Sequence, residues 1–166
     1  MELSKPERWI LSNQYRILEK LYPKEAKNYS EERKAIERGY SLHYDSITQY
    51  IEEGLNKNQC DEVMDILDMY RILKSSVKKL KIRDIKIKFP GFDGNNEGEQ
   101  LGYVRYLIED LNRFIEIKKI SESPNLNSHH QTLELYRRML DEWDKCKNKY
   151  DPTKEEIERI LEVHIK

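Results

Sequence analysis

The residues whose types and spacing could do chemistry are most concentrated in the segment Phe89 to Asp110, FPGFDGNNEGEQLGYVRYLIED. A glycine-rich turn that opens a helix can expose backbone N–H groups to a phosphate. This turn, however, carries Asp93, Glu97 and Glu99 and has no lysine or Ser/Thr at P-loop spacing. The carboxylates would repel a phosphate, so the segment does not predict a nucleotide cradle.

The same carboxylates could instead attract a cation. Asp93, Asn95 and Glu97 alternate like oxygen ligands, but their order does not match an EF-hand loop. Asp and Asn side chains commonly satisfy the N–H groups of turns and helix starts. We therefore predict no metal and no cofactor here, and we expect hydrogen bonds from these side chains to anchor the loop.

A pocket beside the 89–105 segment is the alternative that would make the protein a small-ligand-binding protein or an enzyme. Its predicted lining consists of Arg38, Asp93, Tyr103 and Arg105, which would converge in a concavity with a perturbed carboxylate. An arginine near Asp93 would form a partly buried ion pair that holds the loop.

Other catalytic patterns are missing from the sequence. His129 and His130 are adjacent, so their side chains point in different directions and cannot chelate a metal at i, i+4 spacing. Cys60 and Cys146 stand alone, and no Cys–His, Ser–His–Asp or nucleophile-elbow pattern is present. The sequence therefore predicts no catalytic residues and favours a protein that is not an enzyme.

Positive charge gathers in one stretch, where a single acid, Asp84, accompanies seven basic residues: Lys74, Lys78, Lys79, Lys81, Arg83, Lys86 and Lys88. Such a cluster could bind nucleic acid or another polyanion by releasing counterions. No aromatic side chains interleave with it for base stacking. The other interpretation is a solvated helix end, where lysines complement the helix dipole.

Composition sets the remaining bounds. The 166 residues are 37% charged and 37% hydrophobic, with net charge −1 and eleven tyrosines, and mean hydropathy is −0.91. A lean core and abundant Tyr favour a surface buried against a second subunit. We expect a homodimer whose contact surface includes Phe89, Phe92, Tyr103 and Tyr106, with an unknown protein partner as an alternative. Without an apolar run of membrane length, we expect a soluble cytoplasmic protein with reduced thiols.

Helical periodicity must position these residues, and it recurs along the chain. Predicted helices start at the Ser4–Glu7 capping box, at Pro23 with Gly39 as the C-cap, near Tyr44, after Asn58, over 97–119, after Ser128, which can cap the helix with Gln131, and at the Thr153–Glu156 capping box, the last with His164 on its apolar face. In the helix after Asn58, Ile66, Leu67 and Tyr70 belong to one apolar face. Ile85, Ile87 and Phe89 alternate with lysines, which predicts at most one short β segment. The expected fold is all-α, with about six to seven helices in a single domain, 1–166, whose possible subdomains are 1–80 and 97–166 joined by an 81–96 arm.

The chain also resembles a known family. The stretches that carry the resemblance are ERWILSNQYRILEKL, IERGY, DILDMYRILKSS, FPGFDGNNEGEQLGYVRYLIED and YRRMLDEWDKC. They look like the YfbU family in order and spacing, over almost the whole chain. The resemblance implies a multihelical, cytoplasmic bacterial protein that assembles as a homo-oligomer. It implies no substrate, cofactor or catalytic residue. Our own prediction for the function is a homo-oligomeric interaction or regulatory module.

Overall fold

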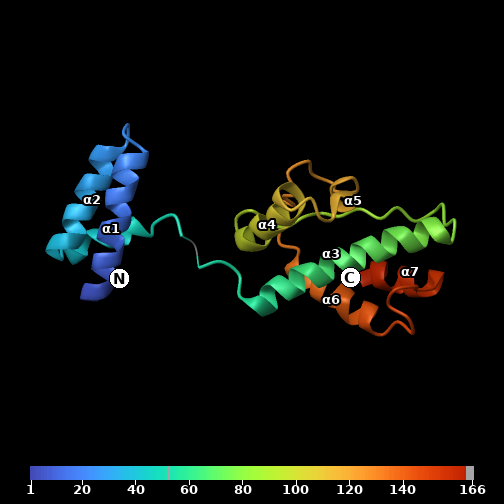
Figure 1. The fold of residues 1–166 in the computed structure, drawn as a ribbon. Helices are drawn as coiled ribbons and strands as arrows, with labels where there is room; N and C mark the ends of the chain where they lie inside the picture. Colours follow the sequence, from blue (N-terminus) through green and yellow to red (C-terminus); the bar gives the residue numbers. More distant parts are fainter. Residues whose placement is uncertain (52, 164–166) are drawn as a thin grey trace. The chain divides into compact units, whose positions relative to one another are not determined.

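The protein is all-α, as predicted. The computed structural model describes residues 1–51 and 53–163, and within these residues it has seven α-helices, two 3-10 turns, one π segment and no strand (Figure 1). The elements in chain order are α1 (Lys5–Leu21), α2 (Ala26–Arg38), η1 (Ser41–His43), η2 (Asp45–Ile47), α3 (Lys57–Lys79), α4 (Gly98–Arg105), the π segment η3 (Tyr106–Asp110), α5 (Ile115–Lys118), α6 (Leu133–Asp144) and α7 (Lys154–Glu162).

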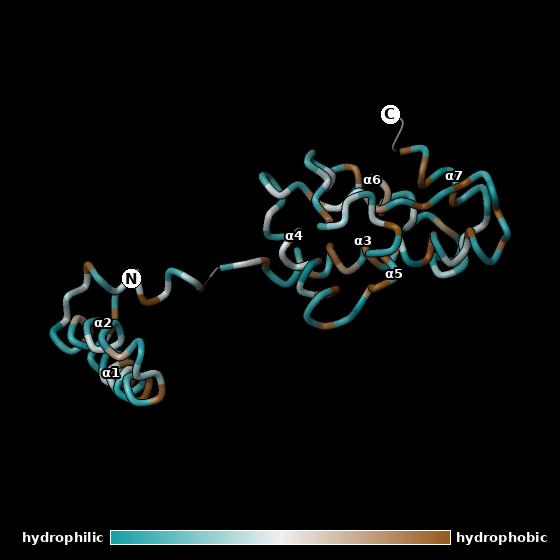
Figure 2. The backbone as a smooth tube through the Cα atoms, turned by 90° about the horizontal axis from the view of Figure 1, so that it is seen from above, coloured by the Kyte–Doolittle hydropathy of each residue, from teal (hydrophilic) through white to brown (hydrophobic). Residues whose placement is uncertain are grey.

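The chain forms two compact units, Met1–Glu53 and Gly54–Lys166. The sequence placed the possible division in the 81–96 arm instead. That arm belongs to the core of the second unit, because Ile87, Phe89 and Phe92 are buried in it. Figure 2 shows hydrophobic and hydrophilic residues mixed along the chain in both units, so the hydropathy pattern did not mark the boundary between the two units.

The first unit is a pair of helices followed by two short turns. Ser4 and Glu7 form the expected capping box at the start of α1. The chain leaves α2 through Gly39, whose φ of 75° is left-handed, as predicted for a C-cap. α2 begins at Ala26 rather than Pro23, and the short helix expected near Tyr44 is reduced to η1 and η2.

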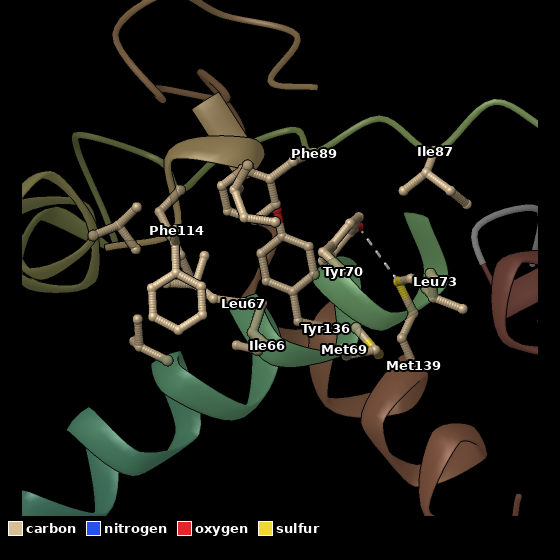
Figure 3. Close-up of a cluster of buried hydrophobic side chains, with 14 of the residues drawn as sticks. Ile66, Leu67, Met69, Tyr70, Leu73, Ile87, Phe89, Phe114, Tyr136 and Met139 are labelled. Carbon is tan, nitrogen blue, oxygen red and sulfur yellow. Dashed lines mark hydrogen bonds between the residues drawn. The ribbon is translucent and has the colours of Figure 1, made fainter. Parts of the chain in front are cut away.

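The second unit is built around α3. Asn56 and Gln59 cap its start, and it packs against α4, α5 and α6. Figure 1 shows α4 and α5 on one side of α3 and α6 and α7 on the other. Four aromatic rings from three segments pack together at the centre: Tyr70 lies edge-on to Phe89 and Tyr136, and Phe92 lies edge-on to Tyr136. Figure 3 shows Tyr70, Phe89 and Tyr136 in this cluster. These contacts tie α3, the arm and α6 into one core.

The arm does not form the short β segment predicted near Ile85–Phe89. Only isolated parallel bridges join Phe89 to Ser121 and Phe92 to Asn127. The Phe89 N–H donates to the carbonyl of Ile120 at 2.9 Å, and the Phe89 carbonyl accepts from Glu122. The alternating pattern does bury one side of the arm, with Ile87 and Phe89 in the core. The arm is not a strand, because among the residues described no extended segment runs beside it to form further backbone hydrogen bonds.

The helix predicted over 97–119 is interrupted. α4 passes into η3, and the chain then turns through Asn112 and Phe114, which both have left-handed φ near 54°. The turn places the Phe114 ring in the core, where the Arg71 guanidinium lies 4.1 Å from its centroid. A left-handed φ is unfavourable for a bulky residue, and the burial of the Phe114 ring offsets that cost.

The last two helices follow the expected order. α6 starts at Leu133 rather than after Ser128, and α7 starts with a Thr153–Glu156 capping box, as predicted. His164, expected on the apolar face of α7, lies outside the described residues. None of the helices in the described part of the chain is long and apolar enough to cross a membrane.

Candidate functional site

The outer face of α1 is the clearest candidate for a functional surface. α1 carries apolar side chains on two sides. One side packs against α2 through Tyr15 with Leu11 and Leu18. The other side exposes large apolar side chains over four turns, with exposed fractions of 70% for Trp9, 52% for Ile10, 58% for Ile17 and 65% for Leu21. We call these four residues the outer stripe.

The spacing of the outer stripe explains its position. Ile10 and Ile17 are seven residues apart and Ile17 and Leu21 are four apart, so at 3.6 residues per turn they share one side of the helix. Trp9 lies about 100° around the helix from Ile10, at one edge of the stripe. The side that packs against α2, with Tyr15 and Leu18, is adjacent to the other edge. A helix with apolar residues on two sides needs two packing partners, and α2 supplies one of them.

A hollow of 320 Å³ lies beside Trp9, with the side chains of Arg8, Ser12, Arg16 and Glu37 in its wall. Glu37 is already held there: its carboxylate accepts from Ser12 Oγ at 2.7 Å and from Arg16 Nη2 at 3.0 Å. The Ser12 hydrogen bond, followed by those from Arg33 and Arg16, lowers the pKa of Glu37 to about 2. These hydrogen bonds fix α1 on α2, while the wall as a whole carries three cationic side chains, those of Lys5, Arg8 and Arg16, and the single carboxylate of Glu37.

The four residues predicted to line a ligand pocket occur in both units. Arg38 belongs to the first unit, where it lines a hollow of 390 Å³ together with Tyr40 and His43. Asp93, Tyr103 and Arg105 belong to the second. There the Arg105 guanidinium donates to the Asn125 carbonyl at 3.1 and 2.8 Å.

Asp93 is buried at the turn and serves the turn itself. Its carboxylate accepts from the Asn95 N–H at 3.1 Å and from the Asn96 side-chain amide. The Asn96 hydrogen bond is the main cause that lowers the pKa of Asp93. The expectation that Asp93 and the asparagines anchor the loop by hydrogen bonds is therefore met.

Two of the residues predicted for an interface are not at the surface. Phe89 and Phe92 are fully buried in the core of the second unit, so their rings are not accessible to a partner. The alternation of Ile85, Ile87 and Phe89, which made the segment look uncovered, places Ile87 and Phe89 in the core. Tyr103 and Tyr106 do form a stacked pair, with ring centroids 6.4 Å apart, and Tyr106 is exposed.

The predicted polyanion site is partly neutralised. Lys79 pairs with Asp151 at 2.7 Å and Lys88 with Glu122 at 3.6 Å, while Lys74 donates to the Glu116 carbonyl. Within residues 1–51 and 53–163 no ion pair or hydrogen bond involves the side chains of the remaining four, Lys78, Lys81, Arg83 and Lys86.

Sequence reasoning missed the role of Glu97. Its buried carboxylate accepts the backbone N–H groups of Asp93, Thr132 and Leu133 and the Thr132 hydroxyl, at 2.7 to 3.0 Å. Glu97 therefore caps α6 in place of the predicted Ser128. No local pattern could have revealed this, because the donors at α6 lie 35 and 36 residues further along the chain.

Fold and surface together define an all-helical protein with a small two-helix unit, in which α2 leaves the outer stripe of α1 exposed, and a larger well-packed helical unit. The YfbU domain matches residues 1–163, so the chain belongs to the YfbU family, as its resemblance indicated. It is similar to the UPF0304 protein MJECS11 of Methanocaldococcus jannaschii, with 40% identity over 167 residues that cover 96% of this chain and 98% of that protein.

Proposed function

We propose that the protein acts as a homo-oligomeric interaction module, in which the outer stripe of α1 packs against the same stripe of a second copy. The function is the presentation of a helical surface rather than catalysis. The observation that carries the proposal is the uncovered stripe of Trp9, Ile10, Ile17 and Leu21 on a unit that buries very little.

The first unit has a small core of its own. Three hydrophobic side chains are buried in it, those of Tyr15, Ile36 and Tyr44, against twenty-two in the second unit's cluster. Small units bury a small fraction of their surface and are marginal without further support. Packing the outer stripe away from water would add about 25 cal/mol for each Å² of apolar surface buried.

A second copy is the occupant that the surface favours. A two-fold axis brings the same patch of both copies together. The outer stripe of one copy would therefore pack against the outer stripe of the other, and no different protein is needed to cover it. The first unit contains nine basic and ten acidic residues, a net charge of −1, so two copies repel one another only weakly. The exposed Trp9 is the residue type most often found as an energetic anchor at interfaces.

Native mass spectrometry and light scattering on the full chain would test the proposal. We expect a dimer for the wild type and a monomer for Ile17→Glu, because the substitution places a charge in the apolar contact. Leu42→Glu is the matched control, since Leu42 is an exposed apolar residue of the same unit outside the stripe, and it should remain a dimer. A monomeric wild type, or a dimeric Ile17→Glu with native helical content, would overturn the proposal.

A second candidate function rests on the four uncommitted cations. Lys78, Lys81, Arg83 and Lys86 follow one another around the end of α3 and the start of the arm, and could together neutralise phosphates. The test is binding of single-stranded and duplex oligonucleotides at several salt concentrations. Binding that falls with salt and is lost in a Lys78→Glu, Lys81→Glu double variant would support this candidate, and unchanged binding in that variant would dispose of it.

A further inference from the structure

The first unit contains a second hollow, separate from the one beside Trp9. It has a volume of 640 Å³ and lies among α1, α2 and the segment that contains η2. Small-molecule sites commonly have volumes of roughly 300 to 1,000 Å³. The aromatic and charged side chains of its wall are three tyrosines and three glutamates: Tyr15, Tyr29, Tyr50, Glu25, Glu31 and Glu32.

The tyrosines provide aromatic surface at different depths. Tyr15 is buried at the base, in the small core, while Tyr29 is half-buried and Tyr50 is exposed at the rim. The rings of Tyr15 and Tyr29 are tilted by 46° with centroids 6.2 Å apart. Two inclined rings therefore border the same space, as in sites that surround an ammonium group with aromatic faces.

The glutamates make the hollow negative. No lysine, arginine or histidine is among the described residues that line it. Glu31 has one distant cation, Lys27, at 4.0 Å, and both side chains are largely exposed. Glu25 accepts the Tyr29 hydroxyl at 3.0 Å. Burial, and then Glu32, raise the pKa of Tyr15, which is consistent with a negative field at the base of the hollow.

These features select an organic cation over a metal ion. No group of three or more His, Cys, Asp or Glu in the described part of the chain is arranged to hold a metal. Aromatic faces bind alkylammonium groups well because the methylenes contact the ring and the charge meets its negative face. Three carboxylates spread along one hollow match several ammonium groups joined by methylene chains, rather than a single compact charge.

We propose that the hollow bordered by Tyr15, Tyr29 and Glu32 binds an aliphatic polyamine. The ammonium groups would pair with Glu25, Glu31 and Glu32, and the methylene chain would lie against the tyrosine rings. This site is distinct from the outer stripe of α1, so it does not depend on whether the protein forms a dimer.

Isothermal titration calorimetry of the full chain with spermidine would test the site, with magnesium chloride as the second ligand. We expect one spermidine per chain and an affinity at least tenfold higher than that for magnesium, which carries charge without methylenes. Equal affinities for the two cations, or no spermidine binding at millimolar concentration, would overturn the proposal.

Three variants locate the binding. Glu32→Gln keeps the side-chain shape and should weaken spermidine binding about tenfold, because it removes one charge from the wall. Tyr29→Leu should weaken it several-fold, whereas Tyr29→Phe should bind within about twofold of the wild type because the ring is kept. Glu155→Gln, on α7 of the other unit, is the control and should bind as the wild type does. Unchanged binding in both Glu32→Gln and Tyr29→Leu would place the ligand elsewhere and overturn the proposal.

Discussion

The Glu97 carboxylate accepts a hydrogen bond from the backbone N–H of Leu133 at 2.7 Å, and so joins the start of α4 to the start of α6. The same carboxylate accepts from Asp93 and Thr132. Buried polar groups are costly unless paired, and here one side chain satisfies several backbone donors that no local residue reaches. The loop that looked like a ligand site is thereby an internal brace of the second unit.

Replacement of Glu97 should therefore destabilise the second unit strongly. Glu97→Ala leaves the backbone N–H groups of Asp93, Thr132 and Leu133 without this acceptor, and we expect it to lower the free energy of unfolding by about 3 kcal/mol. Urea denaturation followed by circular dichroism would measure the change. Glu99→Ala is the control, because Glu99 is an exposed acid in the same helix turn. A similar effect of the two substitutions would contradict the bracing role.

The turn at Gly91 depends on the absence of a side chain. Gly91 has φ of 98°, and a Cβ there would overlap the backbone carbonyl of Leu126. Gly91→Ala should cost more than about 2 kcal/mol, since both the conformation and the contact are incompatible with alanine. Thermal unfolding of this variant would measure the loss.

Gly102 offers the opposite case in the same unit. It lies inside α4, and a Cβ there meets open space. Gly102→Ala should stabilise the protein by about 0.5 to 1 kcal/mol, because alanine has the higher helix propensity. If Gly91→Ala were as stable as Gly102→Ala, the close approach at Leu126 would be refuted.

The first unit should lose stability in acid through Glu37. Its folded-state pKa of about 2 lies below the usual carboxyl value of about 4.3. The stabilisation is therefore complete above that usual value and is lost as pH falls toward 2. After allowance for solvent screening we expect about 1 kcal/mol at neutral pH. Unfolding of wild type and Glu37→Gln, compared from pH 7 to pH 2.5, should show a gap that closes in acid; a constant gap would contradict the assignment.

The two units should differ in local stability when the first is not covered. In the Ile17→Glu variant, amide hydrogen exchange should be at least about tenfold faster in α2, near Ile36, than in α3, near Tyr70, because exchange follows local burial. Mass spectrometry after proteolysis resolves the two segments. Equal protection in both helices would show that the small core around Ile36 is sufficient.

The sequence by itself determined the helical class and much of the local detail. The capping boxes at Ser4 and Thr153 and the C-cap at Gly39 depend on residues within a few positions, so their patterns were enough. The periodicity of α3 likewise predicted its buried face, including Ile66, Leu67 and Tyr70. Helix caps and buried helix faces could be predicted because they depend on residues that are close together in the sequence.

Tertiary structure decided the features that depend on distant partners. Whether alternating apolar residues form a strand or a buried arm depends on what lies beside them, and here the rings of Phe89 and Phe92 pack against Tyr136 of α6. The cap on α6 comes from Glu97, across 36 residues of chain. The exposure of Ile17 also depends on tertiary structure. The sequence places apolar residues on two sides of α1, and the periodicity does not show which side α2 covers.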